Sequence, residues 1–128
     1  MEGRVLNSDL MFMSNWKDIR LELGRTNEFP AGSVSRAYRI RLPLDDNDLL
    51  DEKAIQASPH RATVHRYWSS EPDESGLVVR MDGAWAMQCN GSAVRMLELD
   101  GRPIRLGQQV AVEEPGGMLL PFRIAGIR

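Results

Sequence analysis

The chain has 128 residues, of which 42% are hydrophobic and 27% are charged, and this is the composition of one ordinary globular domain. Its 16 basic and 18 acidic residues give a formal net charge of −2, which argues against binding to nucleic acid or to an anionic membrane through bulk charge. The single cysteine, Cys89, excludes an intramolecular disulfide and a cysteine-rich zinc site. A lone cysteine, together with the lack of an apolar run long enough to span a membrane, predicts a cytoplasmic protein.

Residues 1–13 are predicted to be an N-terminal tail, and residues 14–128 are predicted to be a single β-rich domain. The apolar run at 10–13 is too short for the core of a signal peptide, which needs roughly 7–15 residues. Met13 resembles a second start of the chain, and this favours a tail that precedes the folded part.

Taken in chain order, the first two segments alternate apolar and polar residues with the period of a strand. Lys17–Leu23 fits both a strand and a helix that ends at Gly24, and we prefer the strand. Val34–Leu42 alternates in the same way, and Pro43 is expected to end this strand because it has no backbone N–H to donate.

One short helix is predicted within Asp45–Ser58. Asp48 is a favourable N-cap, and acidic residues at 51 and 52 suit the first turn. Pro59 blocks any continuation. A further strand is predicted directly after this segment, at Ala62–Trp68.

The second half of the chain predicts an antiparallel meander. Three dipeptides that favour two-residue type I′ turns follow one another, namely Asp82-Gly83, Asn90-Gly91 and Asp100-Gly101. Strands are expected around these turns and after them, at Leu77–Met81, Ala84–Cys89, Ser92–Leu99, Arg102–Leu106, Gln109–Glu113 and Met118–Ala125.

Two-residue turns fix which side chains share a face of this meander, because the residues that flank such a turn are direct partners. One face is then apolar and suits a core: Leu77, Val79, Met81, Ala84, Ala86, Leu97, Leu99, Ile104 and Leu106. The other face is mixed but too apolar for a solvated surface: Val78, Arg80, Trp85, Met87, Cys89, Val94, Met96, Glu98 and Arg105.

This second face requires a cover. The candidates are the N-terminal strands or the predicted helix, a bound ligand, and a second copy of the chain. The residues that would contact a second copy in a homodimer are Val78, Trp85, Met87, Val94 and Met96.

The predicted fold is therefore mainly β, with about seven to nine short antiparallel strands closed into a small barrel or a strongly curled meander, and one short helix. Barrel closure is favoured because both faces of the central hairpins carry apolar residues and because strand edges need protection. A two-layer β-sandwich is the alternative.

The best local hint of a binding site is a group of aromatic and basic side chains on two predicted strands. The candidate ligand-binding residues are His65, Arg66, Trp68, Arg80 and Trp85. Arg80 lies opposite Trp85, within reach of a cation–π contact. The competing interpretation is that Arg80 pairs with Glu98 or another acid and that Trp85 is simply packed.

Motifs for catalysis and metal binding are missing from the sequence. It contains no dinucleotide fingerprint, P-loop or nucleophile elbow, and its two histidines, His60 and His65, lack the spacing of a zinc-binding helix pair. The acidic run from Asp45 lacks the glycine and the final glutamate of a calcium loop. We therefore predict no catalytic residues, no metal site and no cofactor.

The predicted function is a non-catalytic module that binds a small molecule or a protein, with a homodimer as one form of it. The alternative is a small enzyme or a single-stranded nucleic-acid binder that uses the His/Arg/Trp cluster at the barrel mouth. The near-zero net charge weighs against the nucleic-acid alternative.

Overall fold

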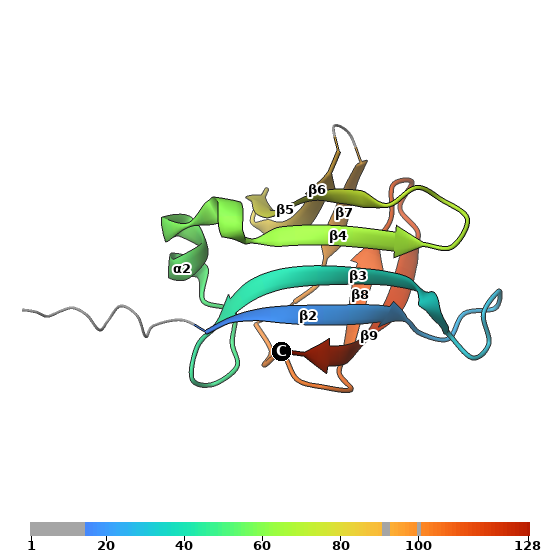
Figure 1. Ribbon diagram of the computed structural model, residues 1–128, viewed down its shortest axis with the longest axis horizontal. Coiled ribbons are helices and arrows are strands. Elements are labelled where there is room, and N and C mark those ends of the chain that lie inside the picture. The colour runs from blue at the N-terminus through green and yellow to red at the C-terminus, as the bar shows by residue number, and fades with distance from the viewer. Residues whose placement is uncertain (1–14, 91–92, 100) are drawn as a thin grey trace, which may run out of the picture.

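The computed structural model describes residues 15–90, 93–99 and 101–128, so the predicted tail at 1–13 lies outside the described residues. Within these residues, eight strands form a closed antiparallel barrel, which confirms the predicted fold class and the barrel (Figure 1). Each strand pairs with the next along the chain, and β9 closes the barrel against β2. The strands are β2 (Asn15–Leu23), β3 (Ser33–Leu44), β4 (Thr63–Trp68), β5 (Glu74–Met81), β6 (Ala84–Cys89), β7 (Ala93–Leu97), β8 (Gln109–Glu113) and β9 (Leu119–Ile127).

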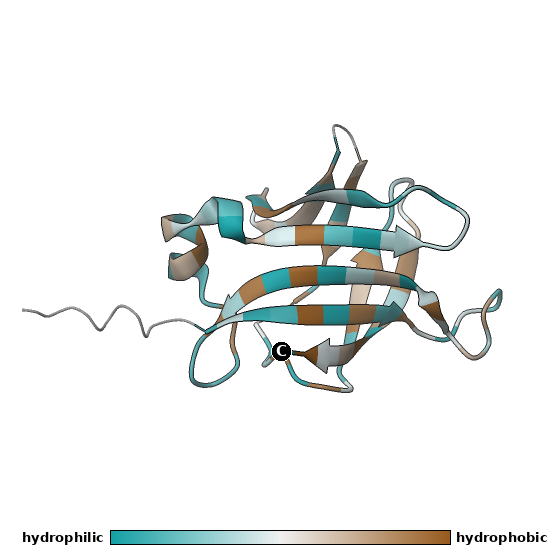
Figure 2. Ribbon diagram, viewed as in Figure 1, coloured by the Kyte–Doolittle hydropathy of each residue, from teal (hydrophilic) through white to brown (hydrophobic). Residues whose placement is uncertain are grey.

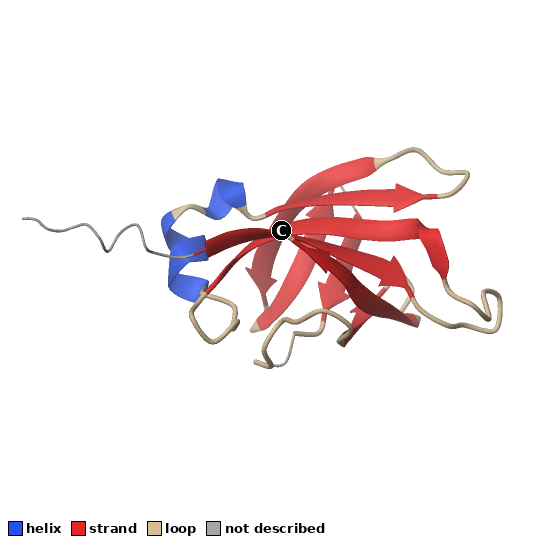
Figure 3. Ribbon diagram, turned by 60° about the horizontal axis from the view of Figure 1, so that its bottom comes forward, coloured by secondary structure: helices blue, strands red, loops and turns tan. Residues whose placement is uncertain are grey.

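The two ends of the barrel differ in their connections. At one end, here called the helix end, lie the helical segment, the 82–83 turn and the 98–108 connection (Figure 3). At the other, the loop end, lie the connections 24–32, 69–73 and 114–118. Hydrophobic and hydrophilic residues alternate along β2 and β3, so that one side of each strand faces the core and the other faces solvent (Figure 2).

The prediction of a strand at 17–23 is confirmed by β2. The prediction that Pro43 ends the next strand is wrong, because β3 continues to Leu44 and Pro43 is the partner of Trp16. Pairing between β3 and β4 stops at Ile40, so no second strand requires an N–H from Pro43. The Pro43 carbonyl instead accepts a hydrogen bond from the backbone N–H of Asp51.

The helix begins later than predicted. Helix α2 spans Glu52–Ala57, and its N-cap is Asp51, whose carboxylate accepts from the Ala54 N–H at 3.2 Å. Asp48, the predicted cap, has a positive φ of 63° and belongs to a tight turn. A 3₁₀ turn, η1 (Pro59–Arg61), leads into β4. Within the described residues no helix is long and apolar enough to cross a membrane.

The first predicted hairpin turn is confirmed. Asp82 and Gly83 have φ values of 53° and 80°, and Met81 pairs with Ala84 as a two-residue type I′ turn requires.

The second hairpin has a different register from the predicted one. Cys89 pairs with Ala93, so three residues separate the partners where two were expected. The Asn90-Gly91 turn lies partly outside the described residues. One extra residue moves every later side chain of the strand to the opposite face. Arg95 and Leu97 therefore share the inner face with Met87, while Val94 and Met96 lie on the outer side.

The third predicted hairpin is not formed. Asp100 lies outside the described residues, and 102–106 is not a strand. Strand β7 pairs instead with β8, at Met96–Glu113 and Leu97–Val112.

The predicted division of the meander into two faces is corrected accordingly. Leu97, Leu99 and Ile104 are buried as expected, but so are Val78, Met87 and Cys89 of the supposed second face. Leu77 and Leu106, which were assigned to the core, are exposed. The five candidate dimer contacts do not form one surface, because Val78 and Met87 fill the barrel interior and Val94 and Met96 lie outside it. The other strands of the barrel provide the cover that the second face requires.

Candidate functional site

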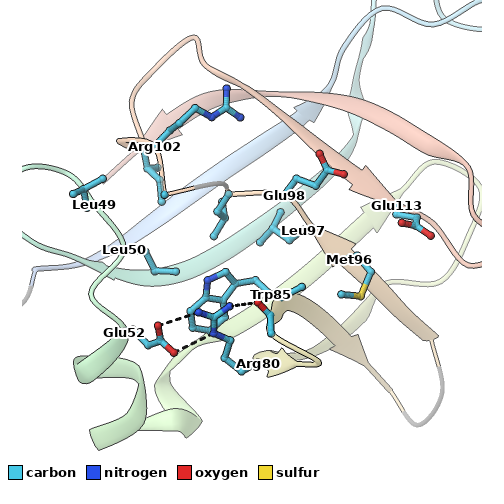
Figure 4. Close-up of a pocket in the computed structure, with 15 residues that line it drawn as sticks. Leu49, Leu50, Glu52, Arg80, Trp85, Met96, Leu97, Glu98, Arg102 and Glu113 are labelled. Carbon is cyan, nitrogen blue, oxygen red and sulfur yellow. Dashed lines mark hydrogen bonds and ion pairs between the residues drawn. The ribbon is translucent and has the colours of Figure 1, made fainter.

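A cavity of about 600 Å³ opens at the helix end of the barrel, and we call it the rim cavity (Figure 4). Its size lies within the range of roughly 300–1,000 Å³ that is typical of small-molecule sites. Apolar side chains make most of its wall: Leu50, Trp85, Met96, Leu97, Leu99 and Ile104.

The rim cavity forms where the barrel is least completely paired. Strands β7 and β8 share only two paired positions before the chain leaves the sheet at residue 98 and returns at 109. The intervening connection is fixed to the segment before α2, because the Ile104 N–H donates to the Asp48 carbonyl at 2.8 Å. The buried side chain of Ile104 forms part of the cavity wall, and the space between this connection and the β5–β6 hairpin remains open.

Trp85 lies within the cavity, and Arg80 holds it in position. The two residues are cross-strand partners beside the type I′ turn, and the Arg80 guanidinium lies 4.5 Å from the centre of the Trp85 ring system. Glu52 of α2 accepts two hydrogen bonds from Arg80, at 3.0 and 3.2 Å, and the Gly83 carbonyl accepts a third at 2.6 Å. The cation–π contact that was within reach is formed. The competing interpretation, that Arg80 pairs with Glu98 or another acid, also holds in part, because Arg80 pairs with Glu52.

The Glu52–Arg80 pair is partly exposed, with side-chain accessibilities of 40% and 45%. Such a pair contributes at most about 1 kcal/mol to stability. Its larger effect is geometric, because a bidentate arginine has a fixed plane and that plane sets the position of the indole beneath it.

The structure separates the other three predicted site residues from the rim cavity. Arg66 and Trp68 point into the barrel at the loop end, and His65 is exposed on the outer face of β4. The Arg66 guanidinium stacks on Trp68 at 4.2 Å and pairs with Glu71 at 2.9 Å. The five residues therefore belong to three different places in the fold.

Arg66 belongs to a buried ionic network that the sequence did not reveal. Glu74 lies between Arg66 and Arg95, at 3.4 Å from each, and Arg95 donates to Glu114 at 2.9 Å. The Tyr38 hydroxyl donates to the same Glu114 carboxylate at 3.0 Å. The residues of this lumen network lie on β3, β4, β5 and β7, except for Glu71, which is in the 69–73 connection, and Glu114, which follows β8 directly.

Tyr38, Arg66 and Arg95 of the lumen network are buried, whereas its carboxylates are partly exposed. Burial, reinforced by the charge of Glu114, raises the pKa of Tyr38 far above its ordinary value. For Arg95, burial works against the charged form, but the hydrogen bond with Glu114 and the nearby acidic groups of Tyr38, Glu114 and Glu74 together outweigh burial, and the pKa is raised. Arg95 was missed because the predicted two-residue turn placed it on the face opposite to Met87, whereas the three-residue connection makes Arg95 and Met87 direct partners.

Cys89 lies beneath this network and is fully buried. Burial raises the pKa of its thiol, which disfavours the reactive thiolate. No group of three or more histidine, cysteine, aspartate or glutamate side chains within the described residues is arranged to hold a metal ion.

No protein-family model, curated protein or solved structure matches this chain in sequence or fold.

Proposed function

We propose that this protein is a non-catalytic binding module whose rim cavity takes a planar, largely apolar small molecule against Trp85. The observation that carries this proposal is the half-buried indole within an apolar cavity of about 600 Å³. An aromatic ring that is fixed in position and reachable from solvent offers a stacking surface at little cost in conformational entropy.

The polar groups of the cavity favour binding over catalysis. The Arg80 guanidinium and the Glu52 carboxylate are hydrogen-bonded to each other. The other charged residues that line the cavity are Glu98, Arg102 and Glu113. This arrangement suits a ligand with an apolar body and a polar edge. A general acid or base needs a carboxyl or imidazole group that is held against the substrate and free to exchange a proton with it. No histidine is among the described residues that line the cavity, Glu52 is committed to Arg80, and the other two carboxylates of the lining, Glu98 and Glu113, are exposed to solvent.

A dye titration tests the proposal. N-phenyl-1-naphthylamine is uncharged and planar, and its fluorescence rises in apolar surroundings. We expect it to bind the wild-type protein, and we expect Trp85→Ala to weaken binding by about threefold to tenfold, since the stacking surface is lost. Leu50→Trp, which fills part of the cavity with a larger side chain, is expected to weaken binding while Trp85 is intact.

The chain offers a matched control in Trp16. This tryptophan is also half-buried and also lies beneath an arginine, with the Arg61 guanidinium 4.4 Å from its ring, but it is not part of the rim cavity. Trp16→Ala should leave the dye affinity unchanged. The proposal is wrong if the dye does not bind, or if Trp16→Ala and Trp85→Ala weaken it equally while Leu50→Trp binds like the wild type.

A further inference from the structure

The small net charge of the chain conceals a cationic surface. The outer face of β9, β2, β3 and β4 lies on the side of the barrel that faces the viewer in Figure 1. Five arginines lie on this outer sheet face, together with two carboxylates, Asp18 and Glu22. The arginines are Arg20, Arg39, Arg41, Arg123 and Arg128. The face therefore carries an excess of positive charge in a protein whose formal charge is −2.

The excess is concentrated in one row across the sheet. Strand register places Gly126, Arg20, Arg39 and His65 side by side on four neighbouring strands. Both carboxylates of the face lie in the adjacent rows, where Asp18 pairs with Arg41 at 3.1 Å and Glu22 pairs with Arg20 at 2.8 Å. Like charges directly opposite each other are unfavourable in a sheet, and two arginines are opposite each other here.

Arg39 is the centre of this row. Within the part of the chain that the structure describes, no carboxylate lies within ion-pair distance of its exposed guanidinium. Beside it, Gly126 leaves a depression of about 210 Å³ that three arginines, Arg20, Arg39 and Arg128, line together with one carboxylate, Asp18. Asp18 and Arg20 are already held in the two ion pairs described above, whereas Arg39 faces the depression without an ion pair among the described residues. Three arginines against one carboxylate leave an excess of positive charge that suits a phosphate group.

Aromatic rings continue the surface beyond Arg39. His65 is its neighbour on β4, and Tyr67 lies two residues further along the same face. The two rings are nearly parallel, at an angle of 24° with centroids 6.5 Å apart. Flat sheet faces that combine basic side chains with such rings bind unpaired bases by stacking, and they hold the backbone by charge.

We infer that the outer sheet face binds single-stranded nucleic acid, with a backbone phosphate in the depression beside Arg39 and a base against His65 and Tyr67. This site is separate from the rim cavity and does not depend on it. The aromatic pair is what favours a single strand, because a duplex or an anionic membrane would use the arginines and leave the rings without a role.

Fluorescence anisotropy with a labelled 12-nucleotide oligouridylate at low salt tests the inference. We expect binding that weakens as salt rises. Arg39→Gln should weaken it roughly threefold to tenfold and should reduce the slope of log K against log salt by about 0.7, the value for one phosphate contact to a single strand. Tyr67→Ala should weaken oligouridylate binding and leave the weaker binding of a duplex of the same length unchanged.

Arg105→Gln is the matched control, since it removes the same charge from an exposed arginine at the helix end. It should bind like the wild type. Thermal melting should show that Arg39→Gln is as stable as the wild type, because the substitution removes a like-charge contact and no ion pair.

Several results would overturn the inference. These are no binding of oligouridylate at low salt, equal effects of Arg39→Gln and Arg105→Gln, and a duplex or anionic phosphatidylserine vesicles bound more tightly than the single strand. Inorganic phosphate and uridine monophosphate serve as competitors. Displacement of the oligonucleotide by millimolar amounts of either would show a site for a free phosphate group and would also contradict the inference.

Discussion

At the scale of single residues, Tyr38 shows how a buried hydroxyl group is accommodated inside the barrel. Its ring packs against Phe122 with centroids 5.2 Å apart, and its hydroxyl reaches the Glu114 carboxylate. Ionisation would place a buried phenolate beside this carboxylate, and the pKa of Tyr38 is raised for that reason.

This raised pKa predicts a loss of stability in alkali. The pKa of Tyr38 is higher in the folded state than in the unfolded state. Its contribution to the free energy of unfolding is therefore complete below about pH 10 and is lost as the pH rises beyond that. In Tyr67→Phe, Tyr38 is the remaining tyrosine of the two in the chain. We expect tyrosinate absorbance to appear only together with unfolding seen by circular dichroism. Tyrosinate formation near pH 10 in a folded protein would contradict the buried position of Tyr38.

Gly76 is a second residue whose identity matters, because the structure leaves no room for a side chain at this position. It lies in β5 between Val64 and Cys89, and an added Cβ would meet the Gln88 carbonyl oxygen and approach the Cys89 Cα to 2.7 Å. Backbone atoms of a paired strand cannot move aside without loss of the β5–β6 hydrogen bonds.

Gly76→Ala should therefore lower the free energy of unfolding by more than roughly 2 kcal/mol, or prevent folding altogether. Gly126→Ala is the comparison, since the nearest atom to its added Cβ would be the Arg20 Cβ at an ordinary 3.7 Å. We expect this variant to remain within about 0.5 kcal/mol of the wild type. Urea unfolding measures both, and equal midpoints would show that β5 and β6 are not paired as described here.

At the scale of elements, the sequence predicted strands well where a single pattern determined them. The alternation at 17–23 and the Asp82-Gly83 turn both led to the observed strands and register. The β6–β7 hairpin shows the limit of such patterns. Asn90-Gly91 favours a two-residue turn locally, but burial of Leu97 and pairing of Arg95 within the barrel favour a register with one more residue. Tertiary contacts decided this register, and they are not visible in a local window of sequence.

The register of β5 and β6, in contrast, was predicted correctly, and it determined how much of the site could be predicted. Arg80 and Trp85 flank a turn that was predicted correctly, and their contact was found in the structure. Glu52, which completes that site, lies 28 residues away in the chain, and no local signal connects it with Arg80. Arg66 and Trp68 share one face of β4, but the sequence did not show that this face is the barrel interior.

At the scale of the whole molecule, the lumen network closes the barrel where backbone pairing is sparse. Strands β7 and β8 are paired at two positions, and Arg95 continues their association through its ion pair with Glu114. Glu74 then connects Arg95 to Arg66 across the lumen. Side chains therefore link β7 to strands that it does not contact through its backbone.

Removal of one member should leave buried charges without partners. We expect Arg95→Met to prevent folding or to lower the free energy of unfolding by about 3–5 kcal/mol. Arg105→Met also removes an ion pair, with Asp48 at 3.1 Å, but that pair is exposed and should be worth at most about 1 kcal/mol. A small and equal effect of the two substitutions on urea unfolding would show that the lumen network does not stabilise the association of β7 with β8.

The barrel thus presents an apolar cavity at one end, a polar lumen near the other and a cationic sheet outside. The claim that the rim cavity is the binding site is tested most directly by the indole N–H signals of the three tryptophans in a ¹H–¹⁵N correlation spectrum, assigned with single tryptophan-to-phenylalanine variants. On titration with N-phenyl-1-naphthylamine, the Trp85 signal should move with saturation while the Trp16 and Trp68 signals stay in place. A stationary Trp85 signal, or saturable movement of Trp16 or Trp68 alone, would contradict the account.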